Sequence, residues 1–276
     1  MLGIGRAHAK TINSTKSVTI CSCEAQRAPE RTLRAGLRRG RCGTLGIFQA
    51  TSPTHVPRPI EIETGPNPTA TILLMHGLGA DGNDFVPIAN ELDLSAVGAV
   101  RFVFPNAPVI PVTINGGYRM PAWYDIAAAD LVKREDDAGL RRSQASIEAL
   151  IANEKQRGIA ADRIVIAGFS QGCAMALLTG LRHAERLGGI VGLSGYLPLA
   201  ATTAAERHAA NHKTPIFLGH GTRDGVVQIE RARASRDALA ALGYTVEWHE
   251  YPMEHSVCME EIADLNRFLL RVLATA

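Results

Sequence analysis

The stretch Ile164-Val165-Ile166-Ala167-Gly168-Phe169-Ser170-Gln171-Gly172 decides the fold class of this chain. It begins with four apolar residues, three of them β-branched, which is typical of a short strand buried on both faces. A Gly-x-Ser-x-Gly step follows, and after it Ala174, Met175, Leu177, Leu178 and Leu181 recur at helical spacing. Strand, tight turn and helix in this order predict a nucleophile elbow with Ser170 at its apex.

The glycines on either side of this serine fit that prediction. A turn that exposes a hydroxyl at the end of a sheet brings strand and helix so close together that only small residues fit at Gly168 and Gly172. The free N–H groups at the start of the following helix would also face a developing negative charge. The pentapeptide alone is equally compatible with a glycine-rich turn holding a solvated serine, so the other loops must decide.

Two of those loops carry the side chains that a serine nucleophile needs. Asp224 follows the apolar run 215–218, and His255 follows the strand candidate 245–251. Histidine can take the proton of a serine hydroxyl during attack, and an aspartate can orient the imidazole and stabilise its charged form. The chain order Ser170, Asp224, His255 is the order found in α/β-hydrolases. We therefore predict these three residues as a catalytic triad.

The oxyanion of such a reaction needs backbone donors. One is expected from the N–H of Gln171, at the start of the elbow helix. The second is expected from the N–H of Leu78, in the loop after the apolar run 71–75. We expect two further histidines at strand ends, His76 and His220, to have structural, hydrogen-bonded roles.

Strand and helix candidates alternate along the whole body of the chain. Strands are predicted at 60–63, 71–75, 100–104, 164–167, 189–193, 215–218 and 245–251. Helices are predicted at 84–92, 228–242 and 256–274, and 127–157 is predicted as one or two helices, with a long connection at 109–125. This alternation predicts an α/β fold with a mostly parallel sheet covered by helices on both faces.

Six motifs in order resemble the carboxylesterase/acyl-protein thioesterase family of α/β-hydrolases. They are His-Gly-Leu-Gly-Ala-Asp-Gly (76–82), Met-Pro-Ala-Trp-Tyr-Asp (120–125), Gly-Phe-Ser-Gln-Gly (168–172), Leu-Ser-Gly-Tyr-Leu-Pro (193–198), His-Gly-x-x-Asp-x-Val-Val (220–227) and Tyr-Pro-Met-x-His-Ser (251–256). The resemblance implies an α/β-hydrolase fold with no separate lid domain over residues 56–276. It also implies the same triad and the same oxyanion donors, Leu78 and Gln171.

The resemblance further implies a carboxylesterase that needs no cofactor and no metal. Its expected substrates are short-to-medium acyl esters, with thioesters on acylated proteins or lysophospholipids as the alternatives. We expect Trp123 and Met120, on the long connection, to form walls of the acyl groove, with a packing role as the alternative. A receptor that keeps only the hydrolase shell is a remote alternative, since this chain retains every residue that the chemistry requires.

Charge and composition restrict the partners. Residues 1–55 hold nine Lys/Arg and two Asp/Glu, whereas the rest holds 20 and 25, so the body is mildly acidic. A mildly acidic body gives no electrostatic reason to expect a nucleic-acid partner. No apolar run is long enough for a membrane helix, and five cysteines in 276 residues do not form a disulfide framework. We expect a cytoplasmic location; a homodimer is left open.

The first 55 residues are predicted as a basic, disordered extension with no sustained hydrophobic period. Their arginine-rich composition is compatible with a targeting segment, a basic interaction arm, or a stretch upstream of the true start.

Overall fold

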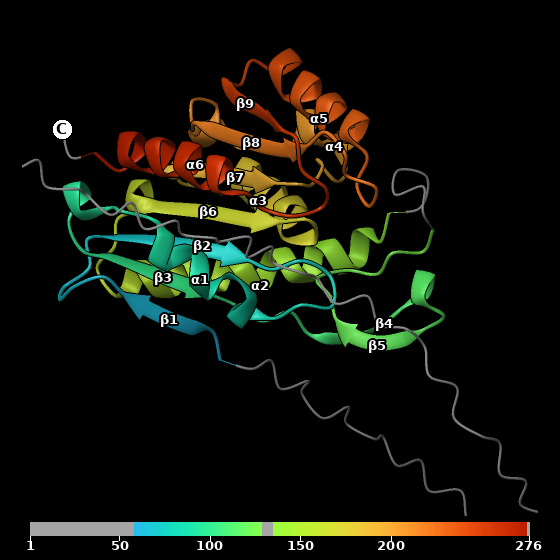
Figure 1. Ribbon diagram of the computed structural model, residues 1–276, viewed down its shortest axis with the longest axis horizontal. Coiled ribbons are helices and arrows are strands. Elements are labelled where there is room, and N and C mark those ends of the chain that lie inside the picture. Colours follow the sequence, from blue (N-terminus) through green and yellow to red (C-terminus); the bar gives the residue numbers. More distant parts are fainter. Residues whose placement is uncertain (1–57, 129–134, 275–276) are drawn as a thin grey trace, which may run out of the picture.

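The computed structural model describes residues 58–128 and 135–274. In this part of the chain, seven strands form one sheet in the order β1-β3-β2-β6-β7-β8-β9 (Figure 1). The strands are β1 (Ile60–Glu63), β2 (Ala70–Met75), β3 (Val100–Phe104), β6 (Ile164–Phe169), β7 (Gly189–Leu193), β8 (Ile216–Gly221) and β9 (Val246–Tyr251). β1 pairs antiparallel with β3, and all other pairs are parallel. The predicted mostly parallel sheet is confirmed, with the elbow strand at its centre.

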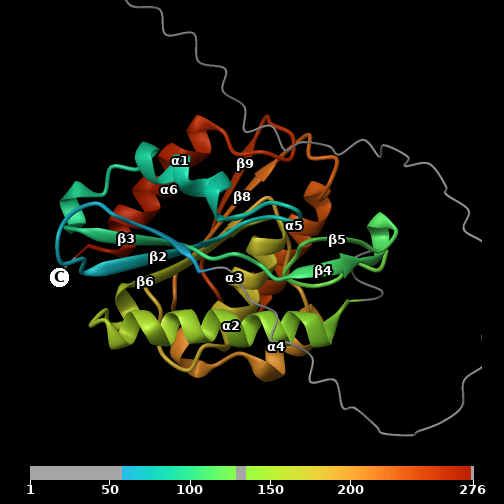
Figure 2. The same cartoon turned by 90° about the horizontal axis from the view of Figure 1, so that it is seen from below.

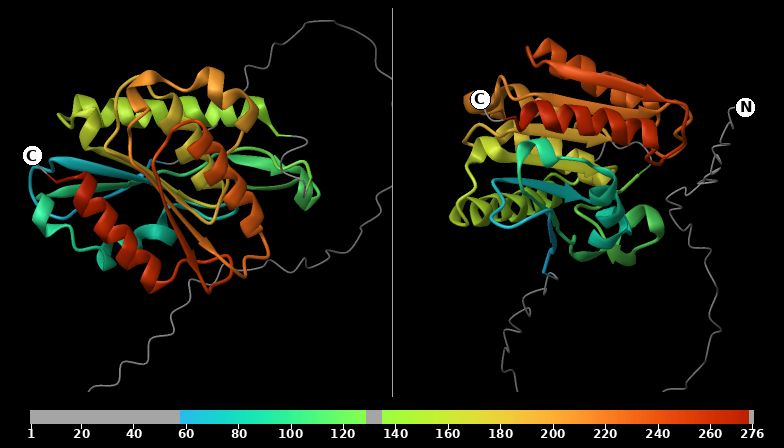
Figure 3. Two further views of the ribbon diagram at one scale, coloured as in Figure 1. Left: turned by 90° about the horizontal axis from the view of Figure 1, so that it is seen from above. Right: turned by 60° about the vertical axis from the view of Figure 1, so that its left-hand side comes forward.

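Helices cover both faces of this sheet (Figure 2). On one face lie α2 (Asp137–Gln156), α3 (Gln171–Arg182) and α5 (Ile229–Ala241), and on the other lie α1 (Val86–Glu91) and α6 (Met259–Val272), the helix drawn in red across the sheet in Figure 3. Each face has its own hydrophobic core, and residues of β6 alternate between the two. This alternation explains why the strand reads as a continuous apolar run.

The parallel register brings the functional loops together. Met75 pairs with Gly168, and Gly221 pairs with Tyr251, so the loops after β2, β6, β8 and β9 leave the same edge. In Figure 1 the arrowheads of β2, β6 and β8 point toward that edge. The loops that carry His76, Ser170, Asp224 and His255 therefore meet there.

Two parts of the fold were not predicted from the sequence. The connection at 109–125 contains a two-stranded hairpin, β4 (Val109–Val112) and β5 (Tyr118–Pro121). Each of its strands contains a proline. Proline argues against a strand when only the sequence is considered, although it is tolerated in an edge strand. The region after β7 contains α4 (Ala200–Glu206), whose alanines and threonines show no apolar periodicity.

The predicted helix at 127–157 is α2, which begins only at Asp137. Asp136 ends the preceding segment and caps the helix, because its side chain accepts a hydrogen bond from the N–H of Gly139. The described residues also form short 3-10 helices at Gly82–Phe85, Ser95–Val97, Thr113–Asn115, Ala161–Arg163 and Ala209–Asn211.

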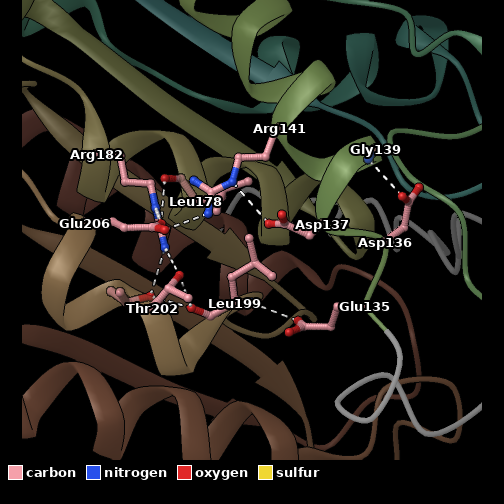
Figure 4. A network of polar contacts seen from close by, with 11 residues as sticks. Glu135, Asp136, Asp137, Gly139, Arg141, Leu178, Arg182, Leu199, Thr202 and Glu206 are labelled. Atoms are coloured by element: carbon pink, nitrogen blue, oxygen red, sulfur yellow. Dashed lines mark hydrogen bonds and ion pairs between the residues drawn. The ribbon is translucent and has the colours of Figure 1, made fainter.

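Helix α4 is held by a charged clamp (Figure 4). Glu206, at its last residue, accepts hydrogen bonds from Arg141 of α2 at 2.7 Å and from Arg182 of α3 at 2.8 Å. The first turn begins after Leu199, a non-glycine residue with a φ of 47° whose N–H donates to Glu135. The clamp thus joins three helices on one face of the sheet.

The predicted extension at 1–55 lies outside the described residues. Within the described residues, no helix has both the length and the apolar character needed to span a membrane.

Candidate active site

Ser170 occupies the strained turn that the sequence predicted. Its φ and ψ are 57° and −116°, a backbone conformation that L-residues rarely adopt. A Cβ atom added at Gly168 would lie 2.1 Å from the carbonyl oxygen of Gly172, and one added at Gly172 would lie 2.1 Å from that of Met75. Strand β6, helix α3 and strand β2 therefore approach so closely that only glycine fits at these two positions.

The structure brings the three residues of the predicted triad into one hydrogen-bonded chain. Nε2 of His255 lies 3.0 Å from Oγ of Ser170, and Nδ1 of His255 lies 2.7 Å from Oδ2 of Asp224. The imidazole packs on Phe169, with ring centroids 4.7 Å apart. The histidine is thus held between the hydroxyl and the carboxylate by one bond on each ring nitrogen.

Asp224 is ionised at neutral pH and hydrogen-bonded through both carboxylate oxygens, although its side chain is fully buried. Burial raises the pKa of this carboxyl, but hydrogen bonds from His255 and from the N–H groups of Val226 and Val227 outweigh burial and leave the pKa below its ordinary value. The two N–H groups both bind Oδ1 at 2.8 Å. Oδ2 is therefore left for histidine.

The predicted oxyanion loop lies directly against the elbow. A Cβ added at Gly77, the residue before Leu78, would lie 3.3 Å from Cβ of Ser170. The N–H of Leu78 and that of Gln171, at the start of α3, come from the two segments expected to supply donors. Their function as an oxyanion hole stays a prediction.

His76 has the structural role expected of it. Its Nε2 accepts a hydrogen bond from the N–H of Ala107 at 3.0 Å, so Nδ1 carries the proton and donates to the carbonyl of Gly77 at 2.7 Å. Burial lowers the pKa of this ring, so it remains neutral. His76 therefore shapes the oxyanion loop through neutral hydrogen bonds.

The side chain of Gln171 has a function that sequence reasoning did not predict. Its Oε1 accepts from the N–H of Trp123 at 3.0 Å, and its Nε2 donates to the carbonyl of Tyr124 at 2.9 Å. The motif Gly-Phe-Ser-Gln-Gly contained the signal, because a buried glutamine needs partners for both ends of its amide. Gln171 thereby ties the elbow to the segment after β5.

The two predicted groove residues occupy different environments. Trp123 is only 3% exposed, and its indole N–H donates to the carbonyl of His76 at 2.9 Å. The structure therefore favours a bracing position behind the oxyanion loop for Trp123 over the predicted groove wall. Met120 is half-buried on β5, with its sulfur 3.7 Å from the position of a Cβ on Gly79. A groove role for Met120 stays a prediction.

Cys173 follows the elbow and is fully buried, which raises its pKa to about 12 and keeps it a thiol. Cys173 and Cys258, the two cysteines among the described residues, are both free, and Cys258 is partly exposed. Over residues 58–128 and 135–274, no group of three or more His, Cys, Asp or Glu side chains is arranged to hold a metal ion.

Comparison with known proteins adds to this geometry. The model of the phospholipase/carboxylesterase family matches residues 60–273. This chain belongs to that family.

Relatives of this family member include acyl-protein thioesterase 1 of Yarrowia lipolytica, 42% identical over 206 residues that cover 73% of this chain and 91% of the relative. Acyl-protein thioesterase 1 of Neurospora crassa is 43% identical over 210 residues, which cover 73% and 86% of the two chains.

Solved structures agree. Arabidopsis thaliana SOBER1 has a TM-score of 0.70 and 31% identity, covering 74% of this chain and 99% of that one. Zea mays acyl-protein thioesterase 2 has a TM-score of 0.68 and 30% identity, covering 78% and 99%. The α/β-hydrolase fold is confirmed, and so is membership of a family of ester and thioester hydrolases.

Proposed function

We propose that this enzyme hydrolyses acyl thioesters and acyl esters through a covalent acyl-enzyme on Ser170. The observation that carries the proposal is the 3.0 Å contact between Nε2 of His255 and Oγ of Ser170, on a histidine that Asp224 orients from the other side. A serine hydroxyl is a weak nucleophile unless a base of this kind takes its proton during attack.

The reaction follows from this arrangement. Oγ of Ser170 attacks the acyl carbonyl carbon while His255 takes the hydroxyl proton, and Asp224 stabilises the imidazolium. The N–H groups of Leu78 and Gln171 receive the oxyanion. When the tetrahedral intermediate collapses, His255 returns the proton to the leaving oxygen or sulfur. Water then attacks the acyl-enzyme by the same steps and frees the acid.

The substrate class that we favour is a fatty acyl group on a protein cysteine. Support comes from the relatives, which are named acyl-protein thioesterases and resemble this chain over most of their length. A thiol has an ordinary pKa of about 8.5 and leaves more readily than an alcohol, so a site built for esters also cleaves thioesters.

A second candidate substrate is a small carboxylic ester, which the family description favours. Comparison of kcat/KM for an S-acylated peptide with kcat/KM for aryl esters of two to sixteen carbons separates the two candidates. A strong preference for the small esters would reject the acyl-protein assignment and leave the acyl-enzyme chemistry intact.

The chemistry itself is tested by Ser170→Ala, with Ser146→Ala as the matched control. Ser146 lies in α2 and donates only to the carbonyl of Arg142 on the exposed face. We expect Ser170→Ala to abolish turnover of an aryl ester and Ser146→Ala to retain it. Near-normal turnover by Ser170→Ala would reject the proposed function.

A further inference from the structure

His220 lies in β8, and its side chain is fully buried beside Asp224. Its Nε2 atom lies 2.7 Å from the carbonyl oxygen of Val227 and 3.4 Å from Oδ2 of Asp224. Oδ2 is the same oxygen that contacts Nδ1 of His255. The buried ring of His220 therefore lies beside the carboxylate of Asp224 and also contacts Val227, at the far end of the loop that carries Asp224.

These contacts assign the proton of His220. Both neighbours of Nε2 are acceptors, so Nε2 carries a hydrogen. Nδ1 has no hydrogen-bond partner among the described residues. His220 lines a small cavity of about 10 Å³ together with Cys173, Leu177 and Trp248. A proton on Nδ1 would be buried without an acceptor, which is unfavourable. The ring is therefore neutral, with its single proton on Nε2.

Neutrality determines what His220 can do to the carboxylate. A second imidazolium at this distance would compete with His255 for Oδ2. A neutral ring leaves the charge of Oδ2 in place, while its N–H holds the acid loop through the carbonyl of Val227. The other titratable groups around His220 are His255, Glu250 on β9 and Cys173 on α3. Burial lowers the pKa of His220 and outweighs the opposite effects of the Val227 carbonyl and of Asp224.

The backbone next to His220 is clamped to the histidine loop. A Cβ added at Gly221 would lie 2.4 Å from the carbonyl oxygens of both Met253 and Glu254, and the N–H of Arg223 donates to Met253 at 3.0 Å. The base of the acid loop is thus fixed against the loop of His255. The tip of the acid loop, at Val226 and Val227, depends on other contacts, and one of these is His220.

We propose that His220 is a positioning residue, a neutral donor that fixes the acid loop at Val227 and keeps Oδ2 of Asp224 aimed at His255. The inference rests on the proposed function and assigns His220 an effect on turnover, beyond the structural role that the sequence predicted. The side chain of His220 is fully buried and does not touch substrate. Its loss therefore changes the rate of the chemical steps and not substrate binding.

A matched pair of amides tests the proposal. Glutamine has the reach to place its N–H₂ where Nε2 of histidine lies, whereas asparagine is one methylene shorter and stops near Nδ1. We expect His220→Asn to lower kcat for a short aryl ester about tenfold with KM nearly unchanged, because the acid is no longer held in register. We expect His220→Gln to recover most of that loss. Equal kcat values for His220→Asn, His220→Gln and the unaltered enzyme would overturn the proposal.

Ser170→Ala in the same assay separates this inference from the function on which it rests. An active Ser170→Ala refutes the proposed function, whereas an inactive Ser170→Ala together with a fully active His220→Asn refutes only the role of His220.

A measurement on the unaltered protein covers the case in which the variants do not fold. In ¹⁵N-edited spectra of the imidazole nitrogens at neutral pH, we expect His220 to show the Nε2–H tautomer. An Nδ1–H tautomer or an imidazolium at neutral pH would contradict the proposal.

Discussion

Glu261 is fully buried in the first turn of α6, and neither of its carboxylate oxygens has a hydrogen-bond partner among the described residues. It fills the space above Gly219, since a Cβ added there would lie 2.1 Å from Oε1. Burial raises the pKa of this carboxyl from 4.5 to about 8. At neutral pH the folded protein therefore keeps a proton on Glu261.

This burial makes stability depend on pH. The folded state holds a proton that the unfolded state gives up above about pH 4.5, so the free energy of unfolding falls as pH rises from about 4.5 to about 8. Glu261→Gln is neutral at every pH and removes that decline. We expect the Tm of Glu261→Gln to rise relative to the unaltered enzyme as pH is increased through this window.

Glu260→Gln is the control for this prediction, because Glu260 is the exposed neighbour and its pKa lies below the ordinary value. Thermal unfolding of the three proteins at several pH values provides the comparison. Parallel Tm curves for Glu261→Gln and the unaltered enzyme would show that folding does not raise the pKa of Glu261.

At the residue scale, the sequence predicted which side chains come together better than it predicted the residues that hold them in place. Ser170, Asp224 and His255 were predicted because chain order and loop position restrict a triad strongly, and the structure brings all three into contact. For Trp123 the sequence left a groove wall and a packing role both open, and the bond from its indole N–H to the carbonyl of His76 was not predicted. A large aromatic residue in a loop reads equally well as a groove wall or as a brace, and only its hydrogen-bond partner decides.

At the scale of elements, the elbow depends on the crossing of α3 over β6 and β2. Gly172→Ala would place a Cβ 2.1 Å from the carbonyl oxygen of Met75, on backbone that cannot move without separating helix from sheet. We expect a loss of about 3 kcal/mol or more in the free energy of unfolding, measured by denaturant titration.

Gly225→Ala is the matched substitution for the elbow. A Cβ at Gly225 would meet no atom within 4 Å. We expect its stability to stay within about 0.5 kcal/mol of the unaltered enzyme. If Gly172→Ala were as stable as Gly225→Ala, the elbow would have space for a Cβ at Gly172, and the close approach of helix and strand would not require glycine there.

The clamp on α4 is a second test at this scale. Hydrogen bonds from Arg141 and Arg182 outweigh the effect of burial and lower the pKa of Glu206 to about 2. The stabilisation is therefore complete above the ordinary carboxyl pKa of 4.5 and is lost as pH falls toward 2. Glu206 is partly exposed, so solvent screening reduces its contribution to about 1 kcal/mol.

We expect Glu206→Gln to lower Tm at neutral pH and to differ less from the unaltered enzyme as pH falls. Glu230→Gln is the control, since Glu230 is 72% exposed and meets Arg233 only at 4.0 Å. A Tm difference that is constant with pH would rule out an ionised Glu206 as the source of the stabilisation.

Helices and strands could be predicted from the sequence where apolar residues recur at a regular spacing. Elements without such a pattern were missed. The seven strands of the sheet were all recognised from apolar runs or alternation. Helix α4 was missed because an alanine- and threonine-rich helix has no apolar stripe, and it is held by charged partners distant in the sequence. The β4–β5 hairpin was missed because proline hides an edge strand.

At the scale of the whole molecule, the family match at 60–273 coincides with the described body of the chain. The division into an extension at 1–55 and a catalytic domain at 56–276, the homodimer and the cytoplasmic location stay predictions. The order of the strands places four loops at one edge of the sheet. We propose that this convergence makes Ser170 a nucleophile.

The most direct test is covalent labelling of the full-length protein with a fluorophosphonate, followed by peptide mass spectrometry. We predict one adduct, on the peptide that contains Ser170, and its absence after Ser170→Ala substitution. Labelling should be slowed by Asp224→Asn, because the imidazole then loses the carboxylate that orients it. No adduct on the unaltered protein, or an adduct on another serine such as Ser194, would show that Ser170 is not the nucleophile.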